Sequence, residues 1–418
     1  MDYEPLTAED VRILELESGT IRGHTCKVIV IGDEHGAEAV REHLAERIDT
    51  VPALRRRLGS VSGRPAWVDD PGFSLERQVL ASGSADDAGL RRLVADAMAQ
   101  RLDRDRPLWE IQVVSPLAGE RTALIWRIHH ALADGFTAMR MFRTLFLQSS
   151  GASPPPAPRP PSIEPRRRAA AELPGTLRRE LRRRGSDSPL DRPVGPHREV
   201  AFVDASLDEL KRIGHAAPER ATVNDVVLSA VGAGLRAWLK ELGAPPERLR
   251  LKVPVSLHRL DEEGAANRDS FMMVDLPLEG SDPVGRLVAV ARETRNCKQH
   301  HDAETLDEFF RDLSHISRSL ERFAEHWAMS PRVFTLNVSN VPGPQGPQLV
   351  LGSPLLELHS LAEVAHRHAL RVAVVSAVGR ISFGLCADPD VVGGLGVIAR
   401  GISGELDALG EALNVGSD

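Results

Sequence analysis

Two adjacent histidines open the segment of the chain that is best suited to acid–base chemistry. The run HHALADG occupies residues 129–135, between a strand-like stretch at 122–128 and a helical stretch that begins at Phe136. The end of a strand exposes side chains at the rim of a sheet, where active sites tend to gather. A neutral imidazole accepts a proton from a hydroxyl near pH 7. The run therefore predicts a histidine general base.

The spacing within this run assigns different roles to its polar residues. Successive side chains at a strand end point in opposite directions, so only one of His129 and His130 can face a given cavity. Asp134 and Gly135 stand at the start of the helix, where an aspartate can cap free N–H groups and a glycine eases the turn. An alternative interpretation makes Asp134 a simple cap and the paired histidines accidental. No metal is predicted, because no further ligands lie at helical spacing.

Strands and helices alternate on both sides of this run, which predicts the α/β class. Before residue 150 the predicted strands are 26–31, 75–81, 108–114 and 122–128, and the predicted helices are 35–48, 88–102 and 136–147. After residue 198 the predicted helices are 222–242, several across 283–330 and one after Pro389, and the predicted strands are 250–257, 271–278, 333–340, 369–377 and 380–387. The pattern indicates two α/β units.

A stretch rich in proline and arginine separates the two halves. Residues 151–200 hold 11 of the 29 prolines, and 11 arginines against 6 acidic residues. Proline breaks helices and favours extended chain. We therefore divide the sequence into an N-terminal domain at 1–150, a linker at 151–198 and a C-terminal domain at 199–418. The basic segment 166–184 is interpreted as a solvated connector, with a helix that binds anionic lipid as the alternative.

Composition narrows the class of protein further. The chain has 418 residues, of which 42% are hydrophobic, and a formal net charge of −7, which excludes a generic nucleic-acid binder. Cys26, Cys297 and Cys386 lie far apart, which argues against a disulfide framework or a zinc site and fits a reducing cytoplasm. The first residues lack the order of a signal peptide, and no apolar run approaches the ~18 residues that span a bilayer. We expect a cytoplasmic protein whose membrane or lipid-inclusion contact is peripheral.

Several further segments lie before and after HHALADG in a recognisable order. They are PLTAEDVRILELES (5–18), Pro107-Leu108-Trp109, Asn224-Asp225, VPVSLHR (253–259), NRDSFMMVDLPL (267–278) and SNVPGP (339–344). HHALADG itself is similar to the HHxxxDG motif of chloramphenicol acetyltransferase-like enzymes, which include nonribosomal peptide condensation domains. The ordered set, which covers nearly the whole chain except the linker, resembles the bacterial wax ester synthase/diacylglycerol acyltransferase family.

That resemblance implies a fold and a reaction. The expected fold is two chloramphenicol acetyltransferase-like α/β sandwich domains with a tunnel at their interface. The expected enzyme is an acyl-CoA-dependent O-acyltransferase that esterifies diacylglycerol or a long-chain alcohol to triacylglycerol or wax ester. Acyl-CoA is a substrate, and no cofactor is expected.

The resemblance also implies site residues. His130 would be the general base in direct transfer, with His129 and Asp134 as its catalytic neighbours. Gly135 would leave room for substrate. Asn224 would orient a substrate or stabilise the oxyanion, with a helix N-cap as the alternative role, and Trp109 would contact substrate or lie in the core.

Two other functions share parts of this signature. A condensation-type acyltransferase that takes its donor from a carrier protein uses the same histidine motif. A non-enzymatic, lipid-associated protein could keep the fold, although the intact HHxxxDG run argues against it. The Asn-Asp, PLW and Asn-Val-Pro-Gly-Pro segments favour the lipid acyltransferase.

Overall fold

The computed structural model shows a mixed α/β chain that forms two compact units. Unit 1 holds residues 1–150, 194–207 and 340–395, and unit 2 holds 151–193, 208–339 and 396–418. The chain thus enters both units more than once, whereas the sequence was divided into consecutive stretches. The structure describes residues 3–147, 188–243, 248–256, 269–278, 280, 282–299 and 334–415. Most of the predicted linker, and the part of the predicted helical stretch 283–330 that follows Gln299, lie outside these residues.

Unit 1 is built on a six-stranded sheet that carries the histidine motif. Its spatial order is β12 (Leu349–Val350), β13 (Ser353–Ala362), β2 (His24–Ile31), β7 (Arg121–His129), β6 (Trp109–Leu117) and β5 (Val79–Ala81). Neighbours are antiparallel except β5 and β6, which are parallel. All eight residues of β2 are buried, as its apolar run predicts for a central strand.

Helices cover both faces of this sheet. On one face lie α2 (Ala37–Ala45) and α5 (Gly135–Phe146), whose apolar residues join Ile29, Trp126 and Ile128 in the main core. On the other face lies α4 (Asp87–Ala99), and the Arg127 guanidinium donates to main-chain oxygens at its C-terminal end. Residues 126 and 127 point to opposite faces because side chains alternate along a strand. These two faces are called the α5 face and the α4 face below.

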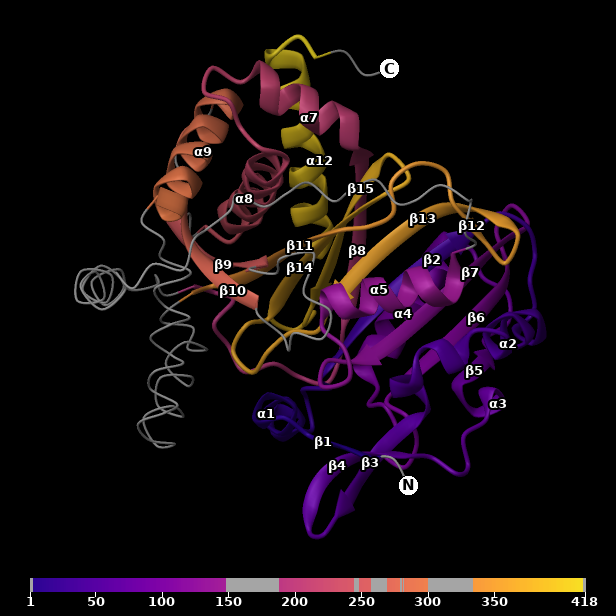
Figure 1. Cartoon of the computed structure of the whole chain (residues 1–418). Coiled ribbons are helices and arrows are strands. Elements are labelled where there is room, and N and C mark those ends of the chain that lie inside the picture. The colour runs from indigo at the N-terminus through magenta and orange to yellow at the C-terminus, as the bar shows by residue number, and fades with distance from the viewer. Residues whose placement is uncertain are drawn as a thin grey trace. The chain divides into compact units, whose positions relative to one another are not determined.

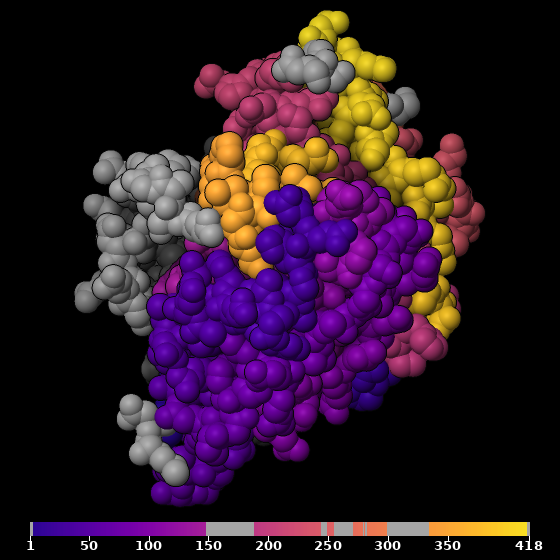
Figure 2. All heavy atoms as spheres, turned by 90° about the vertical axis from the view of Figure 1, so that its right-hand side faces the viewer, coloured from indigo at the N-terminus to yellow at the C-terminus, as the bar shows by residue number. Residues whose placement is uncertain are grey.

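Further strands complete unit 1. The antiparallel set β8 (Glu199–Ser206), β15 (Arg380–Ala387) and β14 (Leu370–Ala377) approaches β13 so closely that a Cβ on Gly384 would collide with the Ser360 carbonyl oxygen. A small sheet joins β1 (Tyr3–Pro5), β4 (Arg64–Asp69) and β3 (Arg56–Val61). The remaining short elements are α1 (Ala8–Leu16), α3 (Leu75–Gln78) and two 3-10 turns at Ile48–Thr50 and Pro52–Arg55. In the space-filling view the segment 3–147, indigo to magenta, forms a continuous surface (Figure 2).

Unit 2 places helices beside a smaller group of strands (Figure 1). Its strands are β9 (Arg248–Ser256) and β10 (Asp269–Pro277), which pair antiparallel, and the start of β11 (Leu336–Pro342), which runs parallel to β9. Its helices are α7 (Leu207–Ala216), α8 (Val223–Glu241), α9 (Pro283–Gln299) and most of α12 (Leu395–Ala412). None of the helices within the described ranges is both long and apolar enough to cross a membrane.

Most predicted elements are confirmed, with one correction and several omissions. The stretch 75–81 was predicted as a single strand, but its first half is the helical turn α3 and only its second half is β5. The Gln78 side-chain amide explains the break, because it is buried and donates to the main-chain oxygens of Pro107 and Trp109. The sequence also failed to predict β8, β13 and the β3–β4 hairpin, where polar residues interrupt the apolar alternation.

The closest helix crossing in unit 2 gives a stability prediction. A Cβ on Gly234 of α8 would lie 2.6 Å from the Ile398 main-chain oxygen of α12, so Gly234→Ala forces backbone apart. We expect a loss of about 1–3 kcal/mol in the free energy of unfolding, measured by denaturant titration. Gly404→Ala in α12 is the control, because nothing lies within 4 Å of its Cβ position. The control should be neutral or stabilising by roughly 0.5–1 kcal/mol; equal losses in both variants would contradict the packing argument.

Candidate active site

The histidine motif lies where the sequence predicts it, between the end of β7 and the start of α5. Asp134 is the N-cap of α5, and its Oδ1 accepts the Thr137 N–H at 2.6 Å. The Leu132 and Ala133 N–H groups both donate to the His129 carbonyl, which closes the loop into a tight turn. The cap and the turn fix the loop that holds both histidines.

His129 is fully buried on the α4 face and is committed to structural hydrogen bonds. Its Nδ1 accepts the Ala131 N–H at 3.1 Å, so this nitrogen carries no proton. The other nitrogen, Nε2, lies 2.8 Å from Glu17 Oε1 and must therefore be the protonated one that donates. A histidine held in one tautomer by two partners is an orienting group, and it is not free to accept a proton from substrate.

Glu17, immediately after α1, anchors His129 to two arginines. Arg104 Nε donates to Glu17 Oε2 at 3.0 Å, and Arg101 Nη2 lies 3.2 Å from the same oxygen. Burial alone would raise the pKa of Glu17, but the hydrogen bond from His129 and the Arg104 charge outweigh burial and lower this pKa. Glu17 therefore stays a carboxylate and holds the His129 ring in place.

His130 is placed differently from its neighbour. It is half-buried, and its main-chain N–H donates to the Gly23 carbonyl at 2.8 Å. In the described part of the chain, no side chain of another residue forms a hydrogen bond with its ring. Burial, followed by the Arg371 charge, lowers the pKa of His130 to about 4, although the Asp134 charge acts in the opposite direction. The ring is therefore neutral at pH 7 and able to accept a proton.

Gly23 lies in close contact with both histidines. It adopts a φ of +71°, and a Cβ at this position would lie 2.6 Å from His129 Nε2. Its carbonyl holds the His130 N–H, as described above. Only glycine combines this backbone conformation with this close approach.

Glu363, immediately after β13, holds the main chain at Arg22 and Gly23. Its carboxylate accepts the N–H groups of Arg22 and Gly23 and lies 3.0 Å from Arg198 Nη2, while its main-chain oxygen accepts Arg371 Nε at 2.9 Å. Burial raises the pKa of Glu363 to about 6, although the Arg198 charge lowers it. The guanidinium groups of Arg198 and Arg371 thus both donate to Glu363, and the Arg371 charge also acts on His130.

The structure places the other predicted residues of unit 1 around the motif. A Cβ on Gly135 would lie 3.4 Å from Val341 Cγ2, so little space remains beside this glycine on that side. Trp109 lies in the main core, with 1% of its surface exposed, and its Nε1 donates to the Leu54 oxygen at 2.7 Å. Its predicted contact with substrate stays a prediction.

Asn224 and its neighbour lie in unit 2, at the start of α8. The N-cap of this helix is Thr222, which forms a capping box with Asp225, so the alternative prediction that Asn224 is the cap is wrong. Thr222 is the cap because its hydroxyl accepts the Asp225 N–H while the Asp225 carboxylate accepts the Thr222 N–H. Asp225 Oδ1 also accepts the Thr294 hydroxyl at 2.6 Å, which ties α8 to α9. Asn224 is half-buried, and its substrate role stays a prediction.

The three cysteines are free and buried, as the sequence predicts for core residues. Burial raises the pKa of Cys26 and of Cys386 to about 12, so both remain thiols at neutral pH. A thiol without thiolate character is a poor nucleophile.

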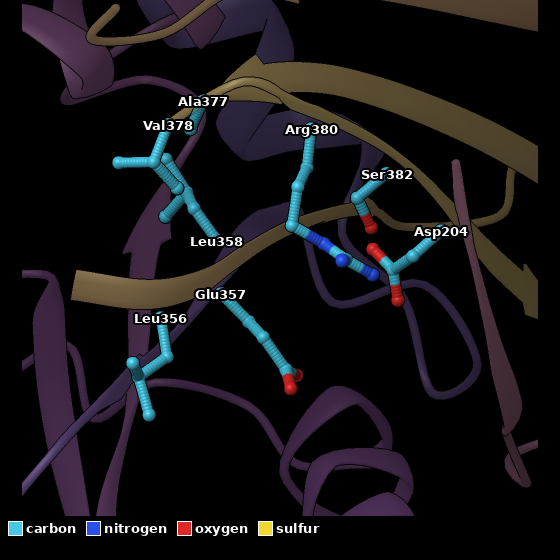
Figure 3. Close-up of a pocket in the computed structure, with 8 residues that line it drawn as sticks. All are labelled: Asp204, Leu356, Glu357, Leu358, Ala377, Val378, Arg380 and Ser382. Carbon is cyan, nitrogen blue, oxygen red and sulfur yellow. The ribbon is translucent and has the colours of Figure 1, made fainter. Parts of the chain in front are cut away.

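One pocket lies in unit 1 away from the histidine motif (Figure 3). It is lined by Asp204, Leu356, Glu357, Leu358, Ala377, Val378, Arg380 and Ser382. The Arg380 side chain extends toward Asp204 in this view. Because none of its lining residues belongs to the motif, this pocket is not the candidate active site. No group of three or more potential metal ligands was found among the described residues.

Sequence reasoning missed Glu17, Gly23, Glu363 and Arg371. Glu17 falls within the opening segment that resembles the family, and Gly23 precedes a predicted strand, so each left a weak signal. Glu363 and Arg371 lie more than two hundred residues after the motif, and only the folded sheet brings them to it.

The cap on α5 gives a prediction for Asp134. Asp134→Ala removes the side-chain acceptor for the Thr137 N–H, and we expect a loss of about 1 kcal/mol in the free energy of unfolding. Asp134→Asn keeps an acceptor oxygen and should lose much less. Denaturant midpoints of both variants test this difference. If Asn costs as much as Ala, the negative charge of Asp134, and not its cap, stabilises the loop.

Comparison with known proteins places the chain in a family. Residues 6–186 match the wax ester synthase/diacylglycerol acyltransferase catalytic domain, and residues 265–410 match the C-terminal domain of the same family. The protein named "Probable diacyglycerol O-acyltransferase tgs1" from Mycobacterium tuberculosis (strain ATCC 25618 / H37Rv) is 30% identical over 447 residues, which cover 96% of this chain and 93% of that protein.

Solved structures confirm the predicted α/β fold class. The wax ester synthase/diacylglycerol acyltransferase from Marinobacter aquaeolei VT8 superimposes with a TM-score of 0.74 at 24% identity, over 98% of this chain and all of that one. The first condensation domain of the calcium-dependent antibiotic synthetase gives 0.63 at 17% identity, over 99% and 97% of the two chains, a likeness in fold alone. The matches to both family domains, together with the 30% identical mycobacterial relative, show that the chain belongs to the wax ester synthase/diacylglycerol acyltransferase family and is an acyltransferase.

Proposed function

We propose that the chain transfers the acyl group of an acyl-CoA to the hydroxyl of diacylglycerol or a long-chain alcohol, with His130 as general base. The observation that carries this proposal is the contrast between the two histidines. His129 is locked between Glu17 and the Ala131 N–H, whereas His130 is neutral and half-buried, without a side-chain partner among the described residues. The names of the relatives supply the substrate class.

The proposed reaction balances as a direct transfer. The His130 imidazole takes the proton of the alcohol while the alcohol oxygen attacks the thioester carbonyl carbon. The tetrahedral intermediate then collapses, the carbon–sulfur bond breaks, and the imidazolium returns its proton to the CoA thiolate. The protonated thiols of Cys26 and Cys386 support a route without an acyl-enzyme, because neither is a ready nucleophile.

The Arg371 charge near His130 suits this order of steps. The Arg371 charge disfavours the imidazolium and, by the same sign, favours negative charge on the thioester oxygen. A base with a low pKa is weaker, but its conjugate acid returns the proton to the leaving thiolate readily.

We further propose that the protein works at the surface of a membrane or lipid inclusion, where both lipids reside. The basic linker segment is the candidate contact and lies outside the described residues.

The first test compares the two histidines. His130→Ala should lower ester formation from palmitoyl-CoA and hexadecanol, or from palmitoyl-CoA and a diacylglycerol, by ~10²–10⁴-fold, with stability close to that of the unmodified protein. His129→Ala should lower stability as well, because it leaves Glu17 beside the arginines without its buried histidine donor. Product is followed by chromatography and stability by thermal unfolding. Near-normal turnover of folded His130→Ala protein would show that this base is wrongly assigned, and absence of ester from every pair would remove the proposed substrates.

The second test is the pH dependence of turnover. With a pKa of about 4, His130 stays neutral until well below the ordinary histidine value of about 6.5, so turnover should persist to pH 5 and fall only near pH 4. In the unfolded chain the same ring protonates near pH 6.5. Below that pH the unfolded state binds more protons, so folding stability decreases as the pH falls from 6.5 to 4.

Stability must therefore be measured at each pH, so that loss of folded protein is separated from loss of the base. Unfolding midpoints in the same buffers supply this correction. A midpoint near 6.5 in the corrected rate profile would contradict the low pKa assigned to His130.

A further inference from the structure

A buried lysine lies in the main sheet of unit 1, on the face that α5 covers. Lys27, in the middle of β2, exposes 1% of its surface, and its Nζ donates to Ser360 Oγ of β13 at 2.6 Å. No carboxylate among the residues that the structure describes forms an ion pair with it. Burial lowers the pKa of Lys27 to about 8, so the side chain is still mainly cationic at pH 7. An ammonium has three donors, and the described contacts use one of them.

Two more buried donors lie beside this lysine without partners. Trp126 stands directly opposite Lys27 on β7, and its indole N–H has no hydrogen-bond acceptor. Thr25 lies two residues before Lys27 on the same face of β2, and its hydroxyl is likewise unpaired. Both side chains are at least nine-tenths buried. Buried polar groups are normally hydrogen-bonded, and a buried donor without an acceptor is destabilising.

The register of the sheet relates these groups to the candidate active site. Residues 124, 126 and 128 face the same side of β7, and His130 follows directly after the end of this strand. Four residues of strand separate Trp126 from His130, which is roughly 13 Å. The charge of Asp134, in the same motif, also acts on Lys27.

We propose that Lys27, Ser360, Trp126 and Thr25 form a subsite for a hydrogen-bond-accepting oxygen group, preferably a carboxylate, on the lipid chain of a substrate whose reacting end lies at His130. This proposal rests on the proposed function and specifies its substrate class. A carboxylate would neutralise the ammonium and accept from the indole and the hydroxyl. An unsubstituted alkyl chain would leave the indole and hydroxyl donors unpaired and the ammonium without a counter-charge.

A purely structural role explains this set less well. A lone charge in a core is costly, and an apolar residue of similar volume would serve a packing role with equal or greater stability. Ser360 lies directly opposite Lys27 in the sheet register. The neighbouring strand therefore supplies a neutral hydroxyl to the lysine and no counter-charge. The arrangement stabilises the core only when an acceptor enters it.

The test measures binding and needs no turnover. The donor pair is decanoyl-CoA and the mono-CoA thioester of decanedioic acid, since roughly 13 Å corresponds to about ten carbon–carbon bonds of extended chain. The acceptor pair is 1-decanol and 10-hydroxydecanoic acid. Dissociation constants for all four are measured by calorimetry on the full-length protein. We expect the carboxylated member of one pair to bind on the order of tenfold tighter, the effect of one good hydrogen bond to a charged group.

Variants assign that preference to the subsite. Lys27→Met keeps the length of the side chain and removes its charge, and it should abolish the preference. Trp126→Phe keeps the ring and removes the N–H, and it should reduce the preference. Lys211→Met is the matched control, because Lys211 is an exposed lysine of α7 paired with Asp208, and it should leave the preference intact.

The outcomes separate the possible results. A preference in the donor pair places the oxygen group on the acyl chain, and a preference in the acceptor pair places it on the alcohol. Equal binding within both pairs, or a preference that survives in folded Lys27→Met protein, overturns the subsite.

Thermal unfolding adds an independent readout, because Lys27→Met should melt at the same or a higher temperature than the unmodified protein. A marked drop in melting temperature would indicate a structural lysine. Absence of ester formation would contradict the proposed function and would leave these binding results unaffected.

Discussion

The pairing of β2 with β7 is the constraint on which the candidate site depends. Its register sets His24 opposite His129, so that Gly23, one residue before the pair, presents its carbonyl to the His130 N–H. The alternation of side chains then sends His129 to the α4 face, toward Glu17, and releases His130 to the other side. A shift of one residue in this pairing would exchange the faces of every side chain on β2. The motif therefore acquires its chemistry from a strand that lies a hundred residues earlier in the sequence.

Buried charge is arranged so that one histidine is structural and the other stays available. Glu17 carries its negative charge to the ring of His129, and two arginines hold that carboxylate in turn. Glu363 accepts hydrogen bonds from Arg198 and Arg371, and burial together with the Arg371 charge keeps His130 neutral. The chain does not rely on one strong pair, because each carboxylate has several donors. Neutrality of His130 is thus a property of its surroundings and not of the motif alone.

The sequence predicted the elements that have a regular apolar period and the motif between them. The strands around Val28 and Ile125 and the helix after Asp134 are apolar at the right spacing, and family resemblance then supplied the fold and the reaction class. It could not predict β13, because Glu357 and His359 interrupt its alternation, and these residues are explained only by partners such as Ser382 on another strand. It also could not predict which groups set the pKa of His130, since Arg371 acts through space from a distant segment.

Resemblance to a family and the chemistry of one core answer different questions. The ordered motifs describe what members of the family share, and they place the chain among acyltransferases. On the subsite proposed above, the buried side chains of β2 and its neighbours would decide what else a substrate carries. Lys27 is a charged residue in a fully buried strand, and a buried charge is unfavourable unless a partner group neutralises it. The unpaired Trp126 and Thr25 donors beside it point to the same missing partner. A departure from the apolar pattern in the core is therefore the most informative feature of this sequence about the identity of its substrate.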